Sequence, residues 1–200
     1  MRSSLKRFII IAVILVISIL LGFIVDIVWK GFEKKAHPNT YLEYVRQYAY
    51  EYNIPEPVIF AMIKVESDFD PQAESYAGAC GLMQIMPKTF EWLTSDEHLG
   101  EHLHKNEIFD AEVNIRYGTY YLNYLYLKFD RNLDTALAAY NAGEGNVAKW
   151  LEDEEYSDGK GNLIKIPFEE TEKYVKKVNN EIDAYKKYYY KDKNEVNEYE

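Results

Sequence analysis

The sequence has very few of the residues that build disulfide or metal scaffolds. It contains 1 cysteine, Cys80, which excludes an intramolecular disulfide. Cys80 has no motif of a reactive thiol, so we expect it to be a small buried hydrophobe. His98, His102 and His104 lie close together, but they lack an HExxH order and their neighbours are polar. We interpret that segment as solvated and expect neither a metal nor a cofactor.

The sequence also has fewer basic than acidic residues. Lys and Arg number 23 against 33 Asp and Glu, which gives a formal net charge of -10. Such a chain has no general attraction for a polyanion, so nucleic acid is not expected as a partner. Disorder and low complexity are excluded as well, because 48% of the residues are hydrophobic and 16% are aromatic. A chain of 200 residues can therefore bury one core of ordinary size.

A long apolar run stands near the N-terminus. Residues 8–25 contain no charged side chain, and Asp26 is the only charge before Lys30. As a helix this run would span roughly 27 Å, close to the hydrocarbon thickness of a bilayer. A buried core helix is the alternative, but at a chain start it would need a much larger protein around it. Residues 17–36 show no small-residue cleavage site, so we expect an uncleaved signal anchor.

The flanks of this run bear on its orientation. Basic residues are nearly balanced, with Arg2, Lys6 and Arg7 on one side and Lys30, Lys34 and Lys35 on the other. The amino terminus and Glu33 shift the balance slightly towards a domain outside the cytoplasm. We therefore predict a single-pass membrane protein in which residues 1–35 form a cytoplasmic stub, anchor and linker. Residues 36–190 would form the extracytoplasmic domain, and the charged residues 191–200 a disordered tail.

Beyond residue 40 the apolar residues fall at helical spacing. Thr40 and Glu43 predict a capping box, and Pro55 or Pro57 suits the first turn of the next helix. Further caps are predicted at Asp110 and Asn132, a helix end at Gly143 and Gly145, and a last helix opened by Pro167. Residues 157–162 predict a turn, and residues 78–86 are too rich in glycine for a helix. With no period-2 run, the fold class is all-α with one long loop.

One carboxyl group interrupts an apolar helix face. Glu66 follows Ile59, Met62 and Ile63 at i, i+3, i+4 and i+7 spacing. Desolvation on such a face would raise the pKa of Glu66, as a general acid working near neutral pH requires. The alternative is a solvated glutamate at the helix end, and periodicity alone does not decide between the two.

No second carboxylate suited to a glycosidase pair is visible nearby. Asp68 lies on the opposite side of a continuing helix, and Asp70 precedes Pro71, which disfavours helical geometry. A pair separated by about 5 to 9.5 Å would need a partner from elsewhere in the chain, such as Glu170 or Asp110. A tyrosine stripe at residues 117–124 is interpreted as core rather than as a ligand platform.

Several linked motifs give a family resemblance. They are Glu66-Ser67, the segment SYAGACGLMQIMP at residues 75–87, AYNAG at 139–143 and ETEKYV at 170–175. In this order and at these separations they resemble the catalytic domain of the soluble-type lytic transglycosylases, which is similar in fold to goose-type lysozyme. The resemblance covers residues 41–185.

The resemblance implies a lysozyme-like domain that cleaves the β-1,4 bond between N-acetylmuramic acid and N-acetylglucosamine in peptidoglycan. Glu66 resembles the family's single catalytic acid/base. The implied substrate-groove residues are Ser75, Met83, Gln84, Tyr140, Asn141, Ala142, Glu170 and Tyr174. Glu172 departs from the family pattern, which often has arginine there. No metal or cofactor is implied, and the partners expected are glycan strands, the membrane and unidentified envelope proteins.

A lone acid suffices if the substrate supplies the rest. The muramic acetamido group can stabilise positive charge at C1, and its own C6 hydroxyl can be the nucleophile, which gives 1,6-anhydro ends. Two alternatives remain open, namely a lysozyme-type muramidase on the same fold and a non-catalytic wall-binding scaffold subunit. Retention of Glu66 with Gln84, Tyr140 and Asn141 favours an enzyme over a scaffold.

Overall fold

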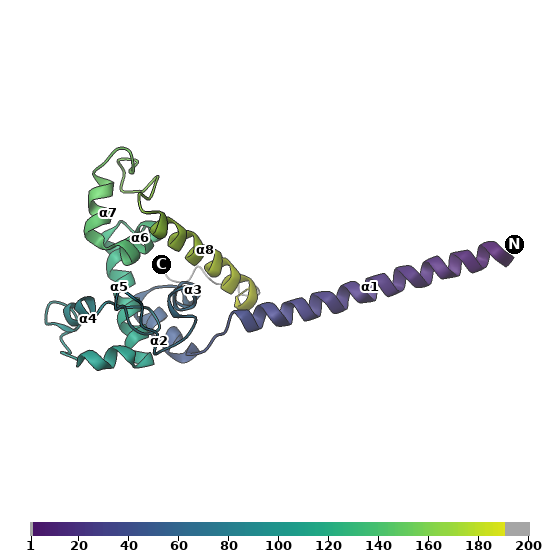
Figure 1. Ribbon diagram of the computed structural model, residues 1–200, viewed down its shortest axis with the longest axis horizontal. Helices are drawn as coiled ribbons and strands as arrows, with labels where there is room; N and C mark the ends of the chain where they lie inside the picture. The colour runs from purple at the N-terminus through teal and green to yellow at the C-terminus, as the bar shows by residue number, and fades with distance from the viewer. Residues whose placement is uncertain (1, 191–200) are drawn as a thin grey trace. The chain divides into compact units, whose positions relative to one another are not determined.

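The chain divides into two compact units, with the boundary between Pro38 and Asn39. The computed structural model describes residues 2–190, and the predicted tail at 191–200 lies outside the described residues. The first unit contains one long helix, α1 (Arg2–Ala36), and the second contains all other helices (Figure 1).

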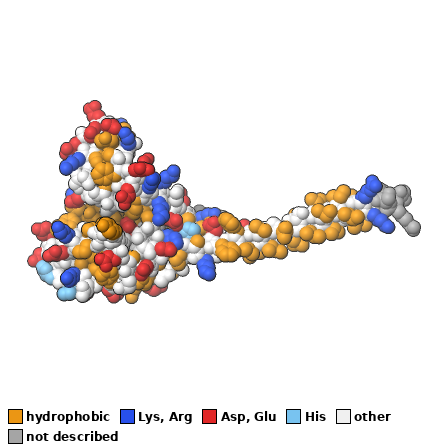
Figure 2. All heavy atoms as spheres, viewed as in Figure 1, with side chains coloured by type: hydrophobic (Ala, Val, Ile, Leu, Met, Phe, Trp, Pro, Cys, Tyr) orange, Lys and Arg blue, Asp and Glu red, His pale blue; other side chains and the backbone are white. Residues whose placement is uncertain are grey.

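Helix α1 has the length and composition of a membrane span. An 18-residue window within its segment Lys6–Glu33 has a mean hydropathy of 3.4, and none of that window is buried inside the structure. Figure 2 shows hydrophobic side chains along most of this helix. Among residues 2–190 it is the only helix long and apolar enough to cross a bilayer. Lys30 forms an ion pair with Asp26 at 2.6 Å, so the one acidic side chain before Glu33 has an intrahelical partner.

The second unit is all-α, as predicted. Its helices are α2 (Leu42–Tyr52), α3 (Glu56–Ser67), α4 (Pro87–Thr94), the 3₁₀ helix η1 (Lys105–Phe109), α5 (Ala111–Lys128), α6 (Leu133–Ala142), α7 (Glu144–Leu151) and α8 (Glu169–Tyr189). Within residues 2–190 the extended backbone forms isolated bridges only, in the loop at 74–85 and in the turn at 157–163. The predicted long loop therefore occupies residues 68–86, between α3 and α4.

Helix α3 lies at the centre of the core and packs against α8 (Figure 1). Its face carries Ile59, Met62 and Ile63, which are all fully buried. Each such side chain contributes about 1.5 to 3 kcal/mol through removal from water. Phe60 stacks on Tyr185 of α8, with ring centroids 5.3 Å apart. The apolar stripe identified in the sequence is thus buried, and Phe60, which lies outside that stripe, is buried as well.

Several predicted helix boundaries are confirmed. Asp110 caps α5 by accepting a hydrogen bond from the Val113 amide at 3.0 Å, and Asn132 caps α6 in the same way. Pro57 lies in the first turn of α3, and Gly143 ends α6 with φ 87°. These boundaries were predictable because each depends on the type of one local residue.

Other boundary predictions are wrong. The capping box of Thr40 and Glu43 does not form, because Tyr41 is the N-cap and its carbonyl already accepts the Val45 amide at 3.0 Å. The helix therefore begins one residue later than that box requires. Gly145 lies inside α7 rather than at a helix end, since the turn is completed at Gly143 alone.

The last helix begins at Glu169, two residues after Pro167, and three short helices were not predicted. These are α4, η1 and α7, whose lengths of 8, 5 and 8 residues give too few turns for a clear apolar period.

The prediction of a solvated histidine segment is wrong for His98. Its ring packs edge-on against Trp92, with centroids 3.9 Å apart, and Nδ1 lies 3.0 Å from the Tyr120 hydroxyl. The segment folds back onto aromatic side chains of α4 and α5, which its polar sequence neighbours did not reveal. His102 and His104 are exposed. Cys80 is buried, as predicted, and burial raises the pKa of its thiol.

Candidate active site

Glu66 stands in the last turn of α3, where that helix is anchored to the long loop. The helix ends at Ser67 because Asp68 adopts a left-handed conformation, with φ 51°. The single O–H of Ser67 is shared between the carbonyl of Ile63, at 3.1 Å, and that of Leu82, at 2.9 Å. The final turn is therefore held both to its own helix and to the loop, and the Glu66 backbone has a fixed position.

A buried asparagine organises the loop that faces Glu66. Asn114 of α5 is 1% exposed and accepts the Met83 amide at 2.7 Å. Its own amide donates to the carbonyls of Cys80 at 3.0 Å and Ile108 at 2.7 Å. Gly81 has φ 75°, and a Cβ there would lie 2.3 Å from the Asn114 side chain, so only glycine fits. One side chain thus satisfies three buried backbone groups.

Replacing Asn114 by alanine should lower the free energy of unfolding of the domain by about 3 kcal/mol. The variant loses three hydrogen bonds and leaves buried backbone groups without partners. Denaturant unfolding of the full chain in detergent measures the effect. Asn123→Ala on the same helix is the matched control and should change stability by less than about 0.5 kcal/mol. Equal stabilities for the two variants would contradict this role of Asn114.

Two tyrosines, the buried Tyr174 and the partly buried Tyr140, lie around the Glu66 carboxyl and the loop. The Tyr174 hydroxyl, from α8, donates to Glu66 Oε1 at 2.7 Å. The Tyr140 hydroxyl, from α6, donates to the Met83 carbonyl at 2.9 Å. Three helices that are distant in sequence therefore converge on one carboxyl group and on the loop beside it.

Burial raises the pKa of Glu66 to about 7, because desolvation penalises the charged carboxylate. The hydrogen bond from Tyr174 and the positive charge of Lys177 act in the opposite direction and offset part of this rise. The negative end of the α3 dipole also disfavours an anion in the last helical turn. Of the two sequence interpretations, the structure therefore supports a desolvated glutamate.

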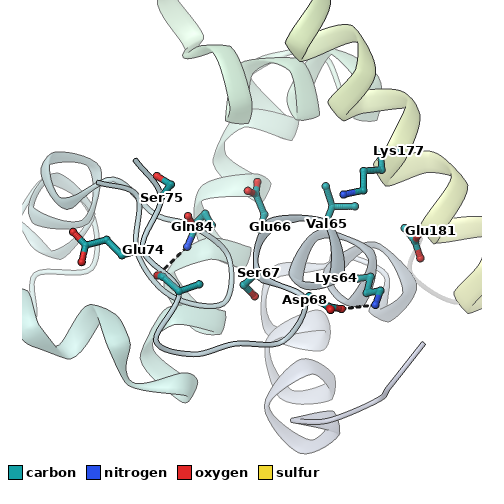
Figure 3. A pocket seen from close by; sticks show the side chains of 11 residues that line it. Lys64, Val65, Glu66, Ser67, Asp68, Glu74, Ser75, Gln84, Lys177 and Glu181 are labelled. Carbon is teal, nitrogen blue, oxygen red and sulfur yellow. Dashed lines mark hydrogen bonds and ion pairs between the residues drawn. The ribbon is translucent and has the colours of Figure 1, made fainter. Parts of the chain in front are cut away.

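A hollow of about 520 Å³ opens beside Glu66 (Figure 3). Its lining residues are Lys64, Val65, Glu66, Ser67, Asp68, Ala73, Glu74, Ser75, Gln84, Lys177 and Glu181. A second hollow, of about 270 Å³, is lined by Gln84, Ile85, Met86, Thr89, Tyr121, Tyr140, Asn141, Ala142 and Gly143. Gln84 lines both, so we treat them as two parts of one groove and name them the charged hollow and the neutral hollow.

The family model described as Transglycosylase SLT domain matches residues 43–163. The chain belongs to this family. The soluble lytic murein transglycosylase of Escherichia coli K12 is 36% identical over 169 residues, which cover 82% of this chain and 25% of that protein. The membrane-bound lytic murein transglycosylase C of Edwardsiella ictaluri is 31% identical over 189 residues, which cover 82% of this chain and 50% of that one. This chain thus spans about a quarter of the soluble relative.

Solved structures agree with the sequence comparison. The 70-kDa soluble lytic transglycosylase from Escherichia coli superposes with a TM-score of 0.70 at 34% identity, covering 78% of this chain and 25% of that one. Its complex with bulgecin A gives a TM-score of 0.71 with the same coverage. An inactive glutamate-to-glutamine mutant of the lytic transglycosylase Slt from Pseudomonas aeruginosa gives 0.67 at 33% identity, covering 76% and 24%. The lysozyme-like SLT fold expected from the motifs is confirmed.

The SLT domain brings most of the implied groove residues together. Ser75 and Gln84 lie with Glu66 in the charged hollow, while Tyr140, Asn141 and Ala142 line the neutral one. Tyr174 contacts Glu66 itself.

Two of the implied residues lie elsewhere. The Met83 side chain is fully buried against Gly118 of α5, where a Cβ would lie 2.5 Å from its sulfur, and it lines neither hollow. Glu170, in the first turn of α8, is exposed and is not among the lining residues of either hollow. Asp110, considered above as a possible second carboxylate, caps α5.

Sequence reasoning missed several charged lining residues of the charged hollow. They are Lys64, Asp68, Glu74, Lys177 and Glu181. A signal for two of them was present, because Tyr174, Lys177 and Glu181 share one face of α8 at i, i+3 and i+7. Because the family motifs already assign Tyr174 to the site, the helical period predicts that Lys177 and Glu181 lie on the same side of the helix.

Proposed function

We propose that this chain is a membrane-anchored lytic transglycosylase that cleaves the β-1,4 bond between N-acetylmuramic acid and N-acetylglucosamine in peptidoglycan. The observation that carries the proposal is Glu66, a desolvated carboxyl in an open groove with a pKa of about 7. Such a group is protonated often enough to act as an acid near neutral pH, and its conjugate base is strong enough to recover a proton. The named relatives of the SLT domain are lytic murein transglycosylases, which agrees with this chemistry.

The proposed reaction uses Glu66 twice. The protonated carboxyl first donates its proton to the glycosidic oxygen, and the bond from that oxygen to muramic C1 breaks. The carboxylate then removes the proton from the muramic C6 hydroxyl, whose oxygen forms a bond to C1. The product is a 1,6-anhydro ring, no water is consumed, and Glu66 ends in its starting protonation state.

Tyr174 would act as a positioning residue for this acid. Its hydroxyl donates a hydrogen bond to Oε1 of Glu66 at 2.7 Å, which leaves Oε2 as the oxygen available to carry the mobile proton. The buried hydroxyl also stabilises the carboxylate form relative to the protonated one. Tyr174 thereby fixes both the direction of the acid and its pKa.

Replacing Tyr174 by phenylalanine should move the alkaline limb of the kcat/KM profile to higher pH by about one unit. The substitution removes a hydrogen bond that favours the carboxylate, so the pKa of Glu66 rises further and its acid form persists to higher pH. Tyr190→Phe removes a similar bond, to Glu56, and should leave the profile unchanged. A Tyr174→Phe profile that keeps its alkaline limb or moves it to lower pH would contradict this assignment.

Two amide side chains in the groove have a free hydrogen-bond acceptor and a free donor, which could bind the acetamido group of the substrate. Gln84 Nε2 donates to the carbonyls of Ala73 at 3.1 Å and Gly81 at 2.9 Å, so its carbonyl oxygen remains as an acceptor. Asn141 Oδ1 accepts from the Thr171 hydroxyl at 2.8 Å, so its amide remains as a donor. An N-acetyl group presents one N–H and one carbonyl, which these two amides complement.

A muramidase that hydrolyses the same bond is the second candidate, because the charged hollow contains further carboxylates. Asp68 is turned towards Lys64, with which it forms an ion pair, and Glu74 points away from Glu66 (Figure 3). Glu181 of α8 also lines the hollow, and its carboxylate points away from Glu66 (Figure 3). None of the three is directed at the space in front of Glu66, which favours attack by the C6 hydroxyl over attack by an activated water. The third candidate, a scaffold that only binds the wall, has no use for a carboxyl with a raised pKa.

Clearing of a peptidoglycan suspension tests the proposed activity directly. The full chain, solubilised in detergent, should lower the turbidity and release soluble muropeptides. A preparation that binds the suspension without releasing muropeptides would support the scaffold and end the proposal of an enzyme.

We also propose that α1 anchors the protein in the cell membrane with the SLT domain outside the cytoplasm. The support is one apolar helix of sufficient length and a relative named as membrane-bound. Protease added to intact protoplasts should then remove the domain. A domain that survives on protoplasts but is degraded after lysis would reverse the topology.

A further inference from the structure

The two parts of the groove differ in charge as well as in size. The larger hollow is lined by six ionisable side chains, from Lys64, Glu66, Asp68, Glu74, Lys177 and Glu181. The smaller hollow has neutral polar, aromatic and aliphatic side chains only. N-acetylated sugar rings are uncharged, so the neutral hollow suits them and the charged hollow has features that the rings alone do not use.

Within the charged hollow, Lys177 is the cation available to a ligand. The Lys64 ammonium is engaged by Asp68, whereas no carboxylate among residues 2–190 forms an ion pair with Lys177. Lys177 extends from α8 towards the side of the hollow where Glu66 stands (Figure 3). An ammonium that forms no ion pair within the protein can form a charge-assisted hydrogen bond with an anion on the substrate, so the anions that the glycan carries determine what Lys177 would bind.

We infer that Lys177 is a specificity-determining residue that binds a carboxylate on the O3 substituent of muramic acid, which in intact peptidoglycan belongs to the peptide stem. The inference rests on the proposed function. The sugar rings carry no anion, so the O3 substituent is the only source of negative charge along the strand. The stem carries carboxylates and, in its diamino acid, an amine, which agrees with a hollow that contains both signs of charge.

The test compares three forms of the same soluble strands, cleaved by the full chain in detergent. One form has intact stems, one has stem carboxylates converted to methylamides, and one has been stripped by an amidase, which exposes the lactyl carboxylate. Lys177→Met should raise KM about 3- to 10-fold on intact strands, with a smaller effect on kcat, because an ion pair with the substrate is lost. It should change KM on the methylamide strands by less than about 1.5-fold.

Two further variants sharpen the result. Lys177→Arg keeps the charge and should retain most of the affinity for intact strands. Lys176→Met is the matched control, since this neighbouring lysine is exposed and does not line the hollow. On stripped strands, a rise in KM for Lys177→Met would show that the lactyl carboxylate can occupy the site, and no rise would assign the site to the stem alone.

Two outcomes would overturn the inference. If Lys177→Met changes KM equally on intact and methylamide strands, Lys177 affects the reaction by altering the pKa of Glu66 and does not bind a substrate carboxylate. If KM on intact strands is unchanged, Lys177 has no part in recognition. Neither outcome affects the proposed function, which fails only if the wild-type chain cleaves none of the three substrates.

Discussion

Replacing Glu66 by glutamine should lower the rate of glycan cleavage by about a hundred- to ten-thousand-fold, the usual contribution of general acid and base catalysis. The glutamine amide is nearly isosteric with the carboxyl group, and its oxygen can still accept the hydrogen bond from the Tyr174 hydroxyl, so the groove keeps its shape. It cannot, however, donate a proton to the glycosidic oxygen or recover one from the C6 hydroxyl. Release of soluble muropeptides from purified peptidoglycan measures the loss.

The same substitution should change how stability depends on pH. The folded-state pKa of Glu66, about 7, lies above the ordinary value of 4.5, so the folded state disfavours ionisation. The wild-type domain should therefore lose stability as pH rises from about 4.5 to about 7, by up to about 3 kcal/mol. The glutamine variant has no such titration, and at pH 8 it should be at least as stable as the wild type.

A matched control separates catalysis from folding. Glu172 is an exposed carboxyl on α8 that lines neither hollow, so Glu172→Gln should keep full activity. Near wild-type turnover by the Glu66→Gln variant would remove Glu66 from the mechanism. A loss of activity accompanied by unfolding would instead show that the carboxyl is needed for the structure.

Cleaved strands should end almost entirely in 1,6-anhydro-muramic acid rather than in a reducing muramic acid. The C6 hydroxyl belongs to the same ring as C1, and a tethered nucleophile has an effective concentration that reaches about 10⁵ M or more in well-oriented cases. Water in an open groove is at most about 55 M, so ring closure should prevail unless a carboxylate activates that water.

Mass and chemical reactivity both report the outcome. An anhydro end is lighter than a hydrolysed end by one water and resists borohydride, because it has no reducing carbon. Reducible ends as the main product would make the protein a muramidase. In that case Glu74→Gln and Asp68→Asn would become the informative variants, since their carboxylates line the same hollow as Glu66.

Helical periodicity located Glu66 because the apolar residues on its helix face are close in sequence. Ile59, Met62 and Ile63 are its neighbours on one helix face, so the chain itself reports their shared surroundings. Periodicity left open whether Glu66 is desolvated, because that depends on elements distant in sequence, such as α8, whose Tyr174 contacts Glu66 from 108 positions away. The family motifs indicated that Glu66 and Tyr174 belong to one site, and the structure shows the hydrogen bond between them.

The parts that escaped prediction are those with no local signature. Asn114 is a polar residue inside a helix, and nothing in its sequence neighbourhood shows that its amide satisfies the backbone of a loop 31 positions earlier. The charged hollow was not predicted, because the sequence does not show that the chain leaves helical geometry directly after Ser67. Asp68 leaves helical geometry at φ 51°, so the argument that set it opposite Glu66 on a continuing helix does not apply.

The dependence of the loop on Asn114 links the thermal behaviour of the active site to that of the core. Loops commonly open at a free-energy cost well below that of global unfolding, and many enzymes lose activity before they melt. Here the segment that carries Gln84 is fastened to a fully buried side chain of α5, so local opening requires breaking the interior of the domain. Heat inactivation and cooperative melting should therefore coincide, and amide hydrogens of this segment should exchange as slowly as those of the central helices.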